Sequence, residues 1–346
     1  TIPSELGRLS SLNILNFGNN ALTGTMPTVL GELTAISQFA AYQNYFTGTL
    51  PTEFGAMTAL TTFFLFENAL TGSLPTAIGH WTAMENLFVS SNFLTGQLPT
   101  QLGRLTSLKH LGLVTNSLTG RLPKEIGECS SLKWFSLGQN RLTGTLPTEL
   151  GQLSVLEFLE VSQTTVNGTL PTELGRLTGL KIFGVDRNFL TGTLPTELGK
   201  ITALNEVYAF NNTLTGALPT ELGGWTKLSI LHLYNNSLAG PIPTELGKLT
   251  DLLQVRLDNN ALTGTIPIEL GKITALNEVY AFNNTLTGAL PTELGGWTKL
   301  SILHLYNNSL AGPIPTELGK LTDLLQVRLD NNALTGTLPT ELGAWN

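Results

Sequence analysis

Residues 228–251 read LSILHLYNNSLAGPIPTELGKLTD, and the whole chain consists of variants of this stretch. Large apolar residues recur at the positions of Leu228, Leu231, Leu233 and Leu238. Asparagine recurs every 24 residues, with Thr164 as the one exception, at Asn20, Asn44, Asn68, Asn92, Asn116, Asn140, Asn188, Asn212, Asn236, Asn260, Asn284, Asn308 and Asn332. A fixed period of this length predicts a stack of similar coils, each of which needs its neighbours to bury its apolar face.

The segment 230–234 alternates with period two, which predicts a short strand with Leu231 and Leu233 pointing inward. Asn236 follows the strand where the chain turns inward, and its amide can both donate and accept hydrogen bonds there. Thr164 offers a hydroxyl instead, so we expect its coil to be the weakest link of this asparagine ladder. The preceding residue, such as Asn235, is expected to be exposed, and we expect Asn235→Leu to be nearly neutral.

The second half of each unit reads, for example, Leu142-Thr-Gly-Thr-Leu-Pro-Thr-Glu-Leu-Gly151. Its first part contains a glycine and a proline, which favour turns. Glycine permits close backbone approach, and proline fixes φ at a turn. The Thr-Glu-Leu-Gly part predicts a short helical turn, which we expect to begin at a Thr cap and to end at Gly.

This pattern resembles the leucine-rich repeat family, in particular the plant-type repeat of receptor-kinase ectodomains and polygalacturonase inhibitors. The motif Gly-Thr-Leu-Pro-Thr-Glu-Leu-Gly is similar to the repeats of algal and diatom members of the family. The resemblance covers residues 1–346 and implies a right-handed α/β solenoid of fourteen 24-residue coils, with a parallel concave β-sheet and short convex helical turns. An uninterrupted period predicts a single domain.

Composition excludes several classes of function. A net charge of −7 argues against a nucleic-acid partner, and no apolar run is long enough to span a membrane. Cys129 stands at a core leucine position, so it is expected to be a buried thiol. The chain begins and ends within a repeat and has no signal peptide. We therefore expect it to be a segment of a longer protein whose signal, caps, anchor or kinase domain lie outside it.

Three repeats are duplicated. Residues 200–271 and 272–343 differ only at Ile266 against Leu338 and Ile268 against Thr340. Either recent unequal crossover or the presentation of one surface twice would account for the copy.

Aromatic residues gather on the predicted outward strand positions, where 12 of 42 residues are aromatic, against 26 in the whole chain of 346. Such residues supply large contact areas at a binding surface, although strands favour aromatics in any case. The candidate ligand-binding residues are Tyr42, Phe64, Phe66, Phe88, Trp134, Phe158, Tyr208, Phe210, Tyr234, Tyr280, Phe282 and Tyr306.

Polar residues of the same face include Arg256 with Asp258 and Arg328 with Asp330, which we expect to be exposed ion pairs worth under about 1 kcal/mol each. His110, His232 and His304 have neither the partners of a nucleophile nor metal-ligand spacing. We expect no catalytic site, no metal and no cofactor.

Five Asn-x-Ser/Thr acceptors for glycosylation occur, at Asn167, Asn211, Asn235, Asn283 and Asn307. All but Asn167 directly precede a ladder asparagine. Their use depends on secretion.

Outward threonine pairs, including Thr143 with Thr145 and Thr191 with Thr193, are predicted to stack from coil to coil on a second short strand. Such columns resemble those of ice-binding solenoids, but Gln97, Arg121, Ala217 and Pro241 interrupt them.

The sequence thus favours a non-enzymatic extracellular or cell-surface recognition or adhesion scaffold that binds a protein, peptide or glycan on its concave aromatic face. Two alternatives stay open: ice binding through the threonine columns, and a self-assembling structural component that associates end to end.

Overall fold

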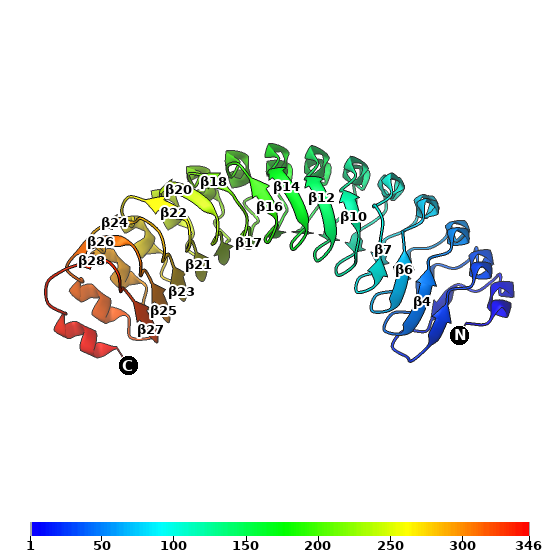
Figure 1. Cartoon of the computed structure of the whole chain (residues 1–346), viewed down its shortest axis with the longest axis horizontal. Helices are drawn as coiled ribbons and strands as arrows, with labels where there is room; N and C mark the ends of the chain where they lie inside the picture. Colours follow the sequence, from blue (N-terminus) through cyan, green and yellow to red (C-terminus); the bar gives the residue numbers. More distant parts are fainter. Residues whose placement is uncertain (1, 346) are drawn as a thin grey trace. The chain divides into compact units, whose positions relative to one another are not determined.

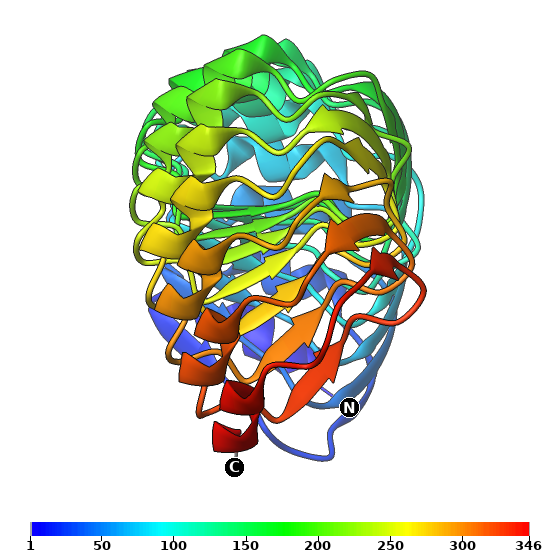
Figure 2. The same cartoon turned by 90° about the vertical axis from the view of Figure 1, so that its left-hand side faces the viewer.

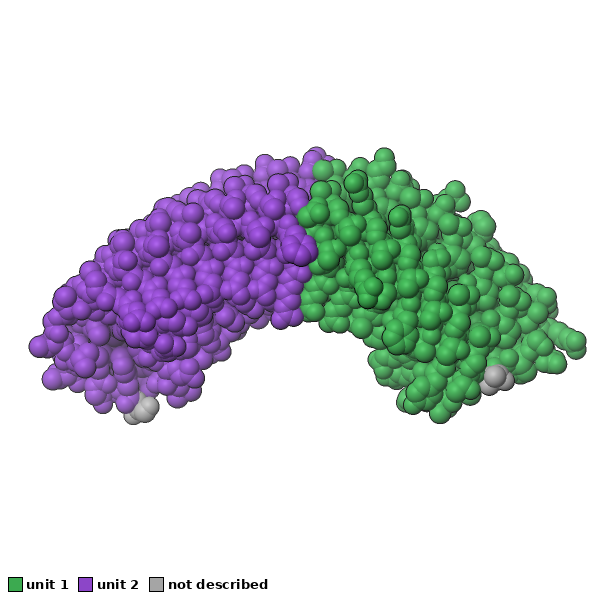
Figure 3. All heavy atoms as spheres, in the orientation of Figure 1, with its two compact units in different colours: residues 1–167 green, residues 168–346 purple. Residues whose placement is uncertain are grey.

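A computed structural model describes residues 2–345. The chain divides into two compact units, Thr1–Asn167 (unit 1) and Gly168–Asn346 (unit 2), which Figure 3 colours separately. The prediction of a single solenoid domain over residues 1–346 stays a prediction.

The main strands of each unit are three residues long, and neighbouring strands are parallel and follow one another in chain order (Figure 1). Those of unit 1 are β1 (Ile14–Asn16), β3 (Gln38–Ala40), β5 (Thr62–Phe64), β7 (Asn86–Phe88), β9 (His110–Gly112), β11 (Trp134–Ser136) and β13 (Phe158–Glu160). Those of unit 2 are β15 (Ile182–Gly184), β17 (Glu206–Tyr208), β19 (Ile230–His232), β21 (Gln254–Arg256), β23 (Glu278–Tyr280), β25 (Ile302–His304) and β27 (Gln326–Arg328).

The central residue of a main strand points inward and is buried, except in β21 and β27, where Val255 and Val327 are half-buried. The flanking residues lie on the outward side, here called the strand face of the unit. In β19, Leu231 is fully buried while Ile230 and His232 are half-buried. The register advances by one repeat, as when His232 pairs with Arg256 and Arg256 with Tyr280. Equivalent side chains therefore lie side by side at the strand spacing of about 4.8 Å.

A second strand follows in each coil. These strands are β2 (Thr23–Thr25), β4 (Tyr45–Thr49), β6 (Ala69–Gly72), β8 (Phe93–Leu94), β10 (Thr119–Arg121), β12 (Arg141–Thr145), β14 (Thr165–Thr169), β16 (Phe189–Thr191), β18 (Thr215–Gly216), β20 (Ser237–Pro241), β22 (Ala261–Thr263), β24 (Thr287–Gly288), β26 (Ser309–Gly312) and β28 (Ala333–Leu334). Each coil therefore contains two strands, and each strand pairs in parallel with its equivalent in a neighbouring coil.

Each coil is completed by a five-residue 3₁₀ helix, and within each unit these helices stack on the side opposite the main strands (Figures 1 and 2). They are η1 (Ser4–Arg8), η2 (Thr28–Glu32), η3 (Thr52–Ala56), η4 (Thr76–His80), η5 (Thr100–Arg104), η6 (Lys124–Glu128), η7 (Thr148–Gln152), η8 (Thr172–Arg176), η9 (Thr196–Lys200), η10 (Thr220–Gly224), η11 (Thr244–Lys248), η12 (Ile268–Lys272), η13 (Thr292–Gly296), η14 (Thr316–Lys320) and η15 (Thr340–Ala344). Within residues 2–345, no helix has the length and apolar content needed to cross a membrane.

The expected Thr cap and Gly stop of these helices are wrong. Pro147 is the N-cap of η7 and forms no side-chain cap bond, while the Thr148 hydroxyl donates to Glu149 at 3.2 Å. The glycine serves close packing between coils. A Cβ on Gly127 would lie 2.5 Å from the Glu149 carbonyl oxygen of the next coil, so only glycine fits.

The asparagine ladder is confirmed. Asn236 Nδ2 donates to the carbonyls of Ala209, Leu233 and Tyr234 at 3.0 to 3.3 Å, and its Oδ1 accepts from Leu214 N at 3.0 Å. One side chain thus joins two coils through groups that strand pairing leaves unsatisfied. Thr164 is buried and accepts from Val166 N at 3.4 Å. Whether its coil is the weakest link stays a prediction.

The residue before each ladder position adopts a left-handed conformation, with φ from 51° to 57° in all fourteen coils. Asparagine tolerates this region better than most residues, whereas leucine does not. Asn235 has φ 52° and is exposed, as expected. This φ argues against the expectation that Asn235→Leu is nearly neutral, because leucine in the left-handed region would cost about 1 kcal/mol.

Candidate functional site

On the strand face of unit 1, six aromatic side chains form one continuous run that crosses the strands obliquely. Tyr42 stacks on Phe66 at 4.7 Å between ring centroids, and Phe66 contacts Phe64 at 6.2 Å. The run continues through Phe88 to Trp134, with centroid distances of 5.4 and 5.5 Å, and ends with Phe158 stacked 5.0 Å from Trp134. It begins at the third outward position of its coil and ends at the first.

Glycine makes room for this run. Phe88 and Trp134 lie two coils apart, and Gly112 of the intervening coil leaves the space in which their rings meet. A Cβ on Gly112 would lie 2.5 Å from Phe88 Cδ1 and 3.2 Å from Trp134. Beside the run is an open pocket lined by Phe64, Phe66, Glu67, Phe88, Ser90 and Ser91.

The strand face of unit 2 carries a different arrangement, in which arginine is inserted between aromatic rings. Phe210 and Tyr234 are stacked, with centroids 4.4 Å apart and planes 9° from parallel. The Arg187 guanidinium lies 5.5 Å from the Phe210 centroid. On the other side, Arg256 is sandwiched 3.9 Å from Tyr234 and 4.8 Å from Tyr280, a geometry that favours cation–π attraction.

Asp258 holds Arg256 in this position. Its carboxylate accepts from Arg256 Nε at 3.2 Å and Nη2 at 3.3 Å, and from Asn259 Nδ2 at 2.9 Å. The Asp258 side chain is fully buried, so the expectation of an exposed ion pair is wrong here. Because the carboxylate is buried, removing its arginine partner would leave a buried charge.

The second copy repeats the arrangement in a more open setting. Phe282 stacks on Tyr306 at 4.4 Å, and Arg328 lies 3.9 Å from the Tyr306 centroid. Arg328 pairs with Asp330 at 3.0 Å, but about half of each side chain is exposed, as the sequence predicted. The two copies of the ion pair differ in exposure because β21 has a main strand on each side, whereas β27 is the last main strand of the described residues.

Histidine and tyrosine side chains complete the strand face of unit 2. His232 lies edge-on to Tyr208 at 5.3 Å, and its Nε2 is 2.7 Å from Gln254 Oε1. Burial lowers the pKa of His232, partly opposed by the Gln254 hydrogen bond. The Tyr208 hydroxyl donates to Glu206 at 2.8 Å, and burial together with this carboxylate raises the pKa of Tyr208. Both rings are therefore neutral near pH 7.

All twelve predicted aromatic residues lie on the strand faces, six in each unit. Eleven are half-buried, whereas Phe210 is only 9% exposed because its neighbours cover it. Sequence reasoning missed Arg187, which occupies the left-handed position before Asn188 and was not counted as outward. It also missed Gly112. A glycine at an outward strand position was the signal in the sequence that rings of the flanking coils could meet there.

The glycosylation candidates are exposed, apart from half-buried Asn211. Asn235 donates to Asn211 at 2.7 Å, and a longer amide row joins Asn259, Asn283, Asn307 and Asn331 at 2.6 to 2.7 Å. The left-handed backbone already accounts for asparagine at these positions. Attachment of glycans stays a prediction.

Equivalent threonine pairs of successive coils are not directly aligned with one another. Thr143, Thr145, Thr191 and Thr193 are exposed, but the second strands pair with an offset of 22 residues, so Thr143 lies beside Thr165. Equivalent threonines are consequently displaced by about 7 Å along the strand, which places them about 8 Å apart. The Thr193 methyl carbon also lies 2.6 Å from where a Cβ of Gly216 would stand, so this threonine packs against the next coil.

Cys129 is fully buried and its Sγ lies 3.2 Å from the Leu102 carbonyl oxygen. Burial raises the pKa of this thiol to about 12, which keeps it protonated and unreactive. The expectation of a core thiol is confirmed.

The coils of each unit thus form a parallel solenoid, and the strand face of each unit carries aromatic and charged side chains. A sequence profile described as Leucine Rich Repeat matches residues 131–153, 227–249 and 299–321. No curated protein sequence matches the chain.

Solved structures give a fuller comparison. The chain is similar to the leucine-rich repeat ectodomain of the plant membrane receptor kinase GASSHO1/SCHENGEN3 from Arabidopsis thaliana, solved in complex with CASPARIAN STRIP INTEGRITY FACTOR 2, with 34% identity and a TM-score of 0.93 over 99% of this chain and 41% of that one. It is also similar to the plant peptide hormone receptor RGFR1 in complex with RGF2, with 32% identity and a TM-score of 0.89 over 100% and 59%. The chain is a leucine-rich repeat solenoid similar to these plant receptors, and it spans less than two thirds of the length of either one.

A plant ice-binding protein is a more distant neighbour, with 27% identity and a TM-score of 0.57 over 73% of this chain and 82% of that one.

Proposed function

We propose that the chain is the ligand-binding part of an extracellular, non-enzymatic recognition protein, and that the aromatic rows of its strand faces hold a peptide or an extended protein segment. The observation that carries this proposal is the immobilisation of half-buried aromatic rings. In unit 2, Tyr234 is fixed between Phe210 and Arg256, and Arg256 is fixed by Asp258. A surface ordered before binding loses little side-chain entropy on contact.

The ring geometry favours a peptide over a glycan. The stacked pairs Tyr42 with Phe66, Trp134 with Phe158 and Phe210 with Tyr234 have interplanar angles of 11°, 19° and 9°. Such rings cover one another's faces and leave mainly their edges for a ligand. Ring edges carry partial positive charge, which suits peptide carbonyl oxygens and the faces of aromatic side chains. A sugar that stacks on aromatic faces would find few of them free.

The extracellular assignment is supported by the similar plant receptor ectodomains, two of which were solved with the ligands CASPARIAN STRIP INTEGRITY FACTOR 2 and RGF2. A secreted or surface-anchored parent protein would also expose Asn235 and its equivalents to glycosylation. End-to-end self-association is a separate prediction that size-exclusion chromatography tests.

Ice binding is the second candidate, because exposed threonine pairs recur and a plant ice-binding protein is among the similar structures. Two observations weigh against it. The second strands are staggered by two residues, and residues such as Arg121 and Pro241 interrupt the columns. A flat, regular array of hydroxyl and methyl groups is therefore not continuous.

The test begins with a displayed library of random peptides selected on the purified chain, followed by calorimetric titration of the enriched peptides. Two variants test the strand faces. One replaces three aromatic residues of unit 2 by Ala, at Tyr208, Tyr234 and Tyr280, and the other replaces Phe64, Phe88 and Trp134 of unit 1. We expect peptide binding to weaken by at least about tenfold in one of the two variants.

The matched control replaces Thr143, Thr145, Thr191 and Thr193 by Val, which keeps the side-chain shape and removes the hydroxyls. Peptide binding should survive in this variant. Faceted ice crystals with the wild-type chain, lost in the valine variant, would instead establish the ice-binding alternative and overturn the proposal.

A further inference from the structure

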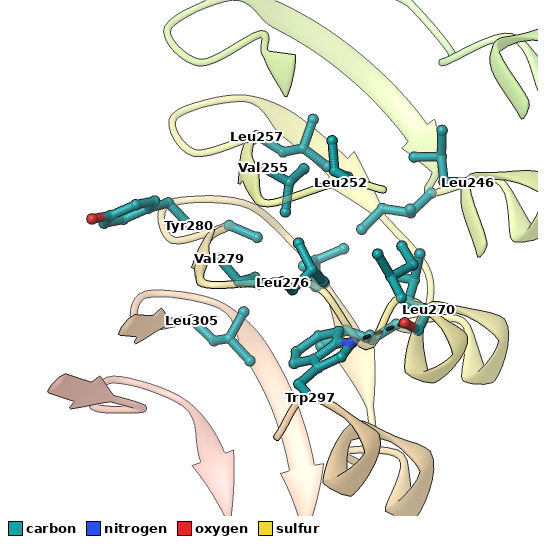
Figure 4. A pocket seen from close by; sticks show the side chains of 15 residues that line it. Leu246, Leu252, Val255, Leu257, Leu270, Leu276, Val279, Tyr280, Trp297 and Leu305 are labelled. Atoms are coloured by element: carbon teal, nitrogen blue, oxygen red, sulfur yellow. Dashed lines mark hydrogen bonds between the residues drawn. The ribbon is translucent and has the colours of Figure 1, made fainter. Parts of the chain in front are cut away.

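Unit 2 contains an interior cavity of about 40 Å³ at the junction of the two duplicated segments. Its walls come from four successive repeats. Figure 4 shows Leu252, Val255 and Leu257 on one side, Val279 in the middle, and Trp297 and Leu305 on the other. The lining side chains are hydrocarbon except for Tyr280 and Trp297. The Tyr280 hydroxyl donates to Glu278, and Trp297 Nε1 donates to the Leu270 carbonyl oxygen at 2.8 Å.

The duplication explains why the cavity lies there. Residues 272–343 copy residues 200–271, so Val279 and Ala281 are the copies of Val207 and Ala209. Val207 pairs with Phe183 of the coil before it, whereas Val279 pairs with Val255. The junction therefore sets two valines side by side where the original sequence has a phenylalanine beside a valine. The larger side chain is missing and the backbone spacing is unchanged.

Side-chain exposure agrees with loose packing at the junction. Phe183 and Leu198 are both 2% exposed, while their equivalents Val255 and Leu270 are half-buried. Val279 and Ala281 are 6% and 5% exposed, against 2% and 0% for Val207 and Ala209. Identical residues are thus less well covered when the preceding coil carries Val255.

We infer that this junction cavity, which lies among the buried side chains and borders the strand face only through Tyr280, is a binding site for small apolar molecules of a few atoms. A water molecule would find no unpaired polar group in the lining to bond to. Apolar cavities stay dry for this reason and can accept xenon or small hydrocarbons. Dispersion contacts with Val255, Val279 and Leu305 supply the attraction.

The probe is xenon, applied under pressure to crystals of the whole chain. An anomalous peak is expected between Val255, Val279 and Leu305. The same crystal contains its own control, the equivalent place bounded by Phe183, Val207 and Leu233, where we expect no peak. A crystal with no peak at the junction, or with equal peaks at both places, would overturn the inference.

The second measurement uses the double variant V255F/L257V, which recreates the Phe183 and Val185 arrangement at the junction. This variant should lose the xenon peak and gain about 2 °C in Tm, because the cavity is filled with a side chain that the chain already uses in the same setting. Retention of the peak, or a fall in Tm, would show that the missing Phe side chain is not the cause of the cavity.

Discussion

The strand faces of unit 1 and unit 2 are built on the same short strands but present different chemistry. Unit 1 carries a run of six neutral aromatic rings from Tyr42 to Phe158, with Gly112 leaving space for contact across a coil. Unit 2 carries rings alternating with arginine, fixed by the buried Asp258. The buried positions set the backbone in both units, so the outward positions vary independently of it. Recognition can therefore change along such an array while the fold is retained.

The largest expected effect concerns what the two units share. Asn92 in unit 1 and Asn236 in unit 2 make the same three donated bonds and one accepted bond. Asn92→Leu and Asn236→Leu should each lower the free energy of unfolding by about 1 to 3 kcal/mol, because buried backbone groups lose their partners. Urea unfolding of the two variants measures this loss. A large difference between them would break the claim of a common backbone.

Asn235 provides the local control for the ladder. Asn235→Gly should be close to neutral, since glycine accepts the left-handed conformation, whereas Asn235→Leu should cost about 1 kcal/mol. Equal unfolding midpoints for these two variants would contradict the role given to the backbone at this position.

The next effect separates the two copies within unit 2. Arg256→Met should destabilise the chain by about 2 kcal/mol, because the Asp258 carboxylate stays buried with fewer donors. Arg328→Met should change stability little, since that ion pair is largely exposed to solvent. Thermal unfolding of the two variants compares one substitution in two environments. Equal losses would show that burial of Asp258 does not matter.

A smaller effect tests the aromatic run of unit 1. Gly112→Ala places a methyl group against Phe88 and Trp134 and should cost about 1 kcal/mol through displacement of these rings. Near-ultraviolet circular dichroism should report the altered surroundings of Trp134. Gln38→Ala, an exposed substitution on the same strand face, is the control and should leave both the spectrum and the stability unchanged.

The smallest effect is pH dependence in unit 2. Burial lowers the pKa of His232 and of His304, so the unfolded chain binds protons at these residues at a higher pH than the folded chain does. Stability should therefore fall as pH decreases through the unfolded histidine pKa of about 6.5 toward the lower folded values. Tm measured between about pH 7 and about pH 5 should decline less in a His232→Gln, His304→Gln double variant. An identical decline would assign it to other groups.

Much of the candidate site followed from the alternation of each strand. Because side chains alternate between the two faces, the residue pattern alone placed Tyr42, Trp134 and Tyr234 outward. The same pattern gave no information on Asp258, which is outward by position yet fully buried. Its burial accompanies specific side-chain contacts, such as the hydrogen bonds from Arg256 of its own coil, and the repeat pattern does not specify such contacts.

The sequence by itself determined the coil, with its 24-residue period, its buried leucines and its asparagine ladder. Each of these is a local pattern that recurs along the chain, so only one way of stacking the coils satisfies all repeats. The burial of Cys129 followed because this residue occupies a leucine position of the pattern. Only the tertiary structure decided which outward side chains touch, such as Phe88 with Trp134 across Gly112, and how far the second strands are offset. It also decided that Val255 beside Val279 leaves a cavity. These features depend on the volumes and rotamers of side chains in neighbouring coils, which the repeat pattern does not specify.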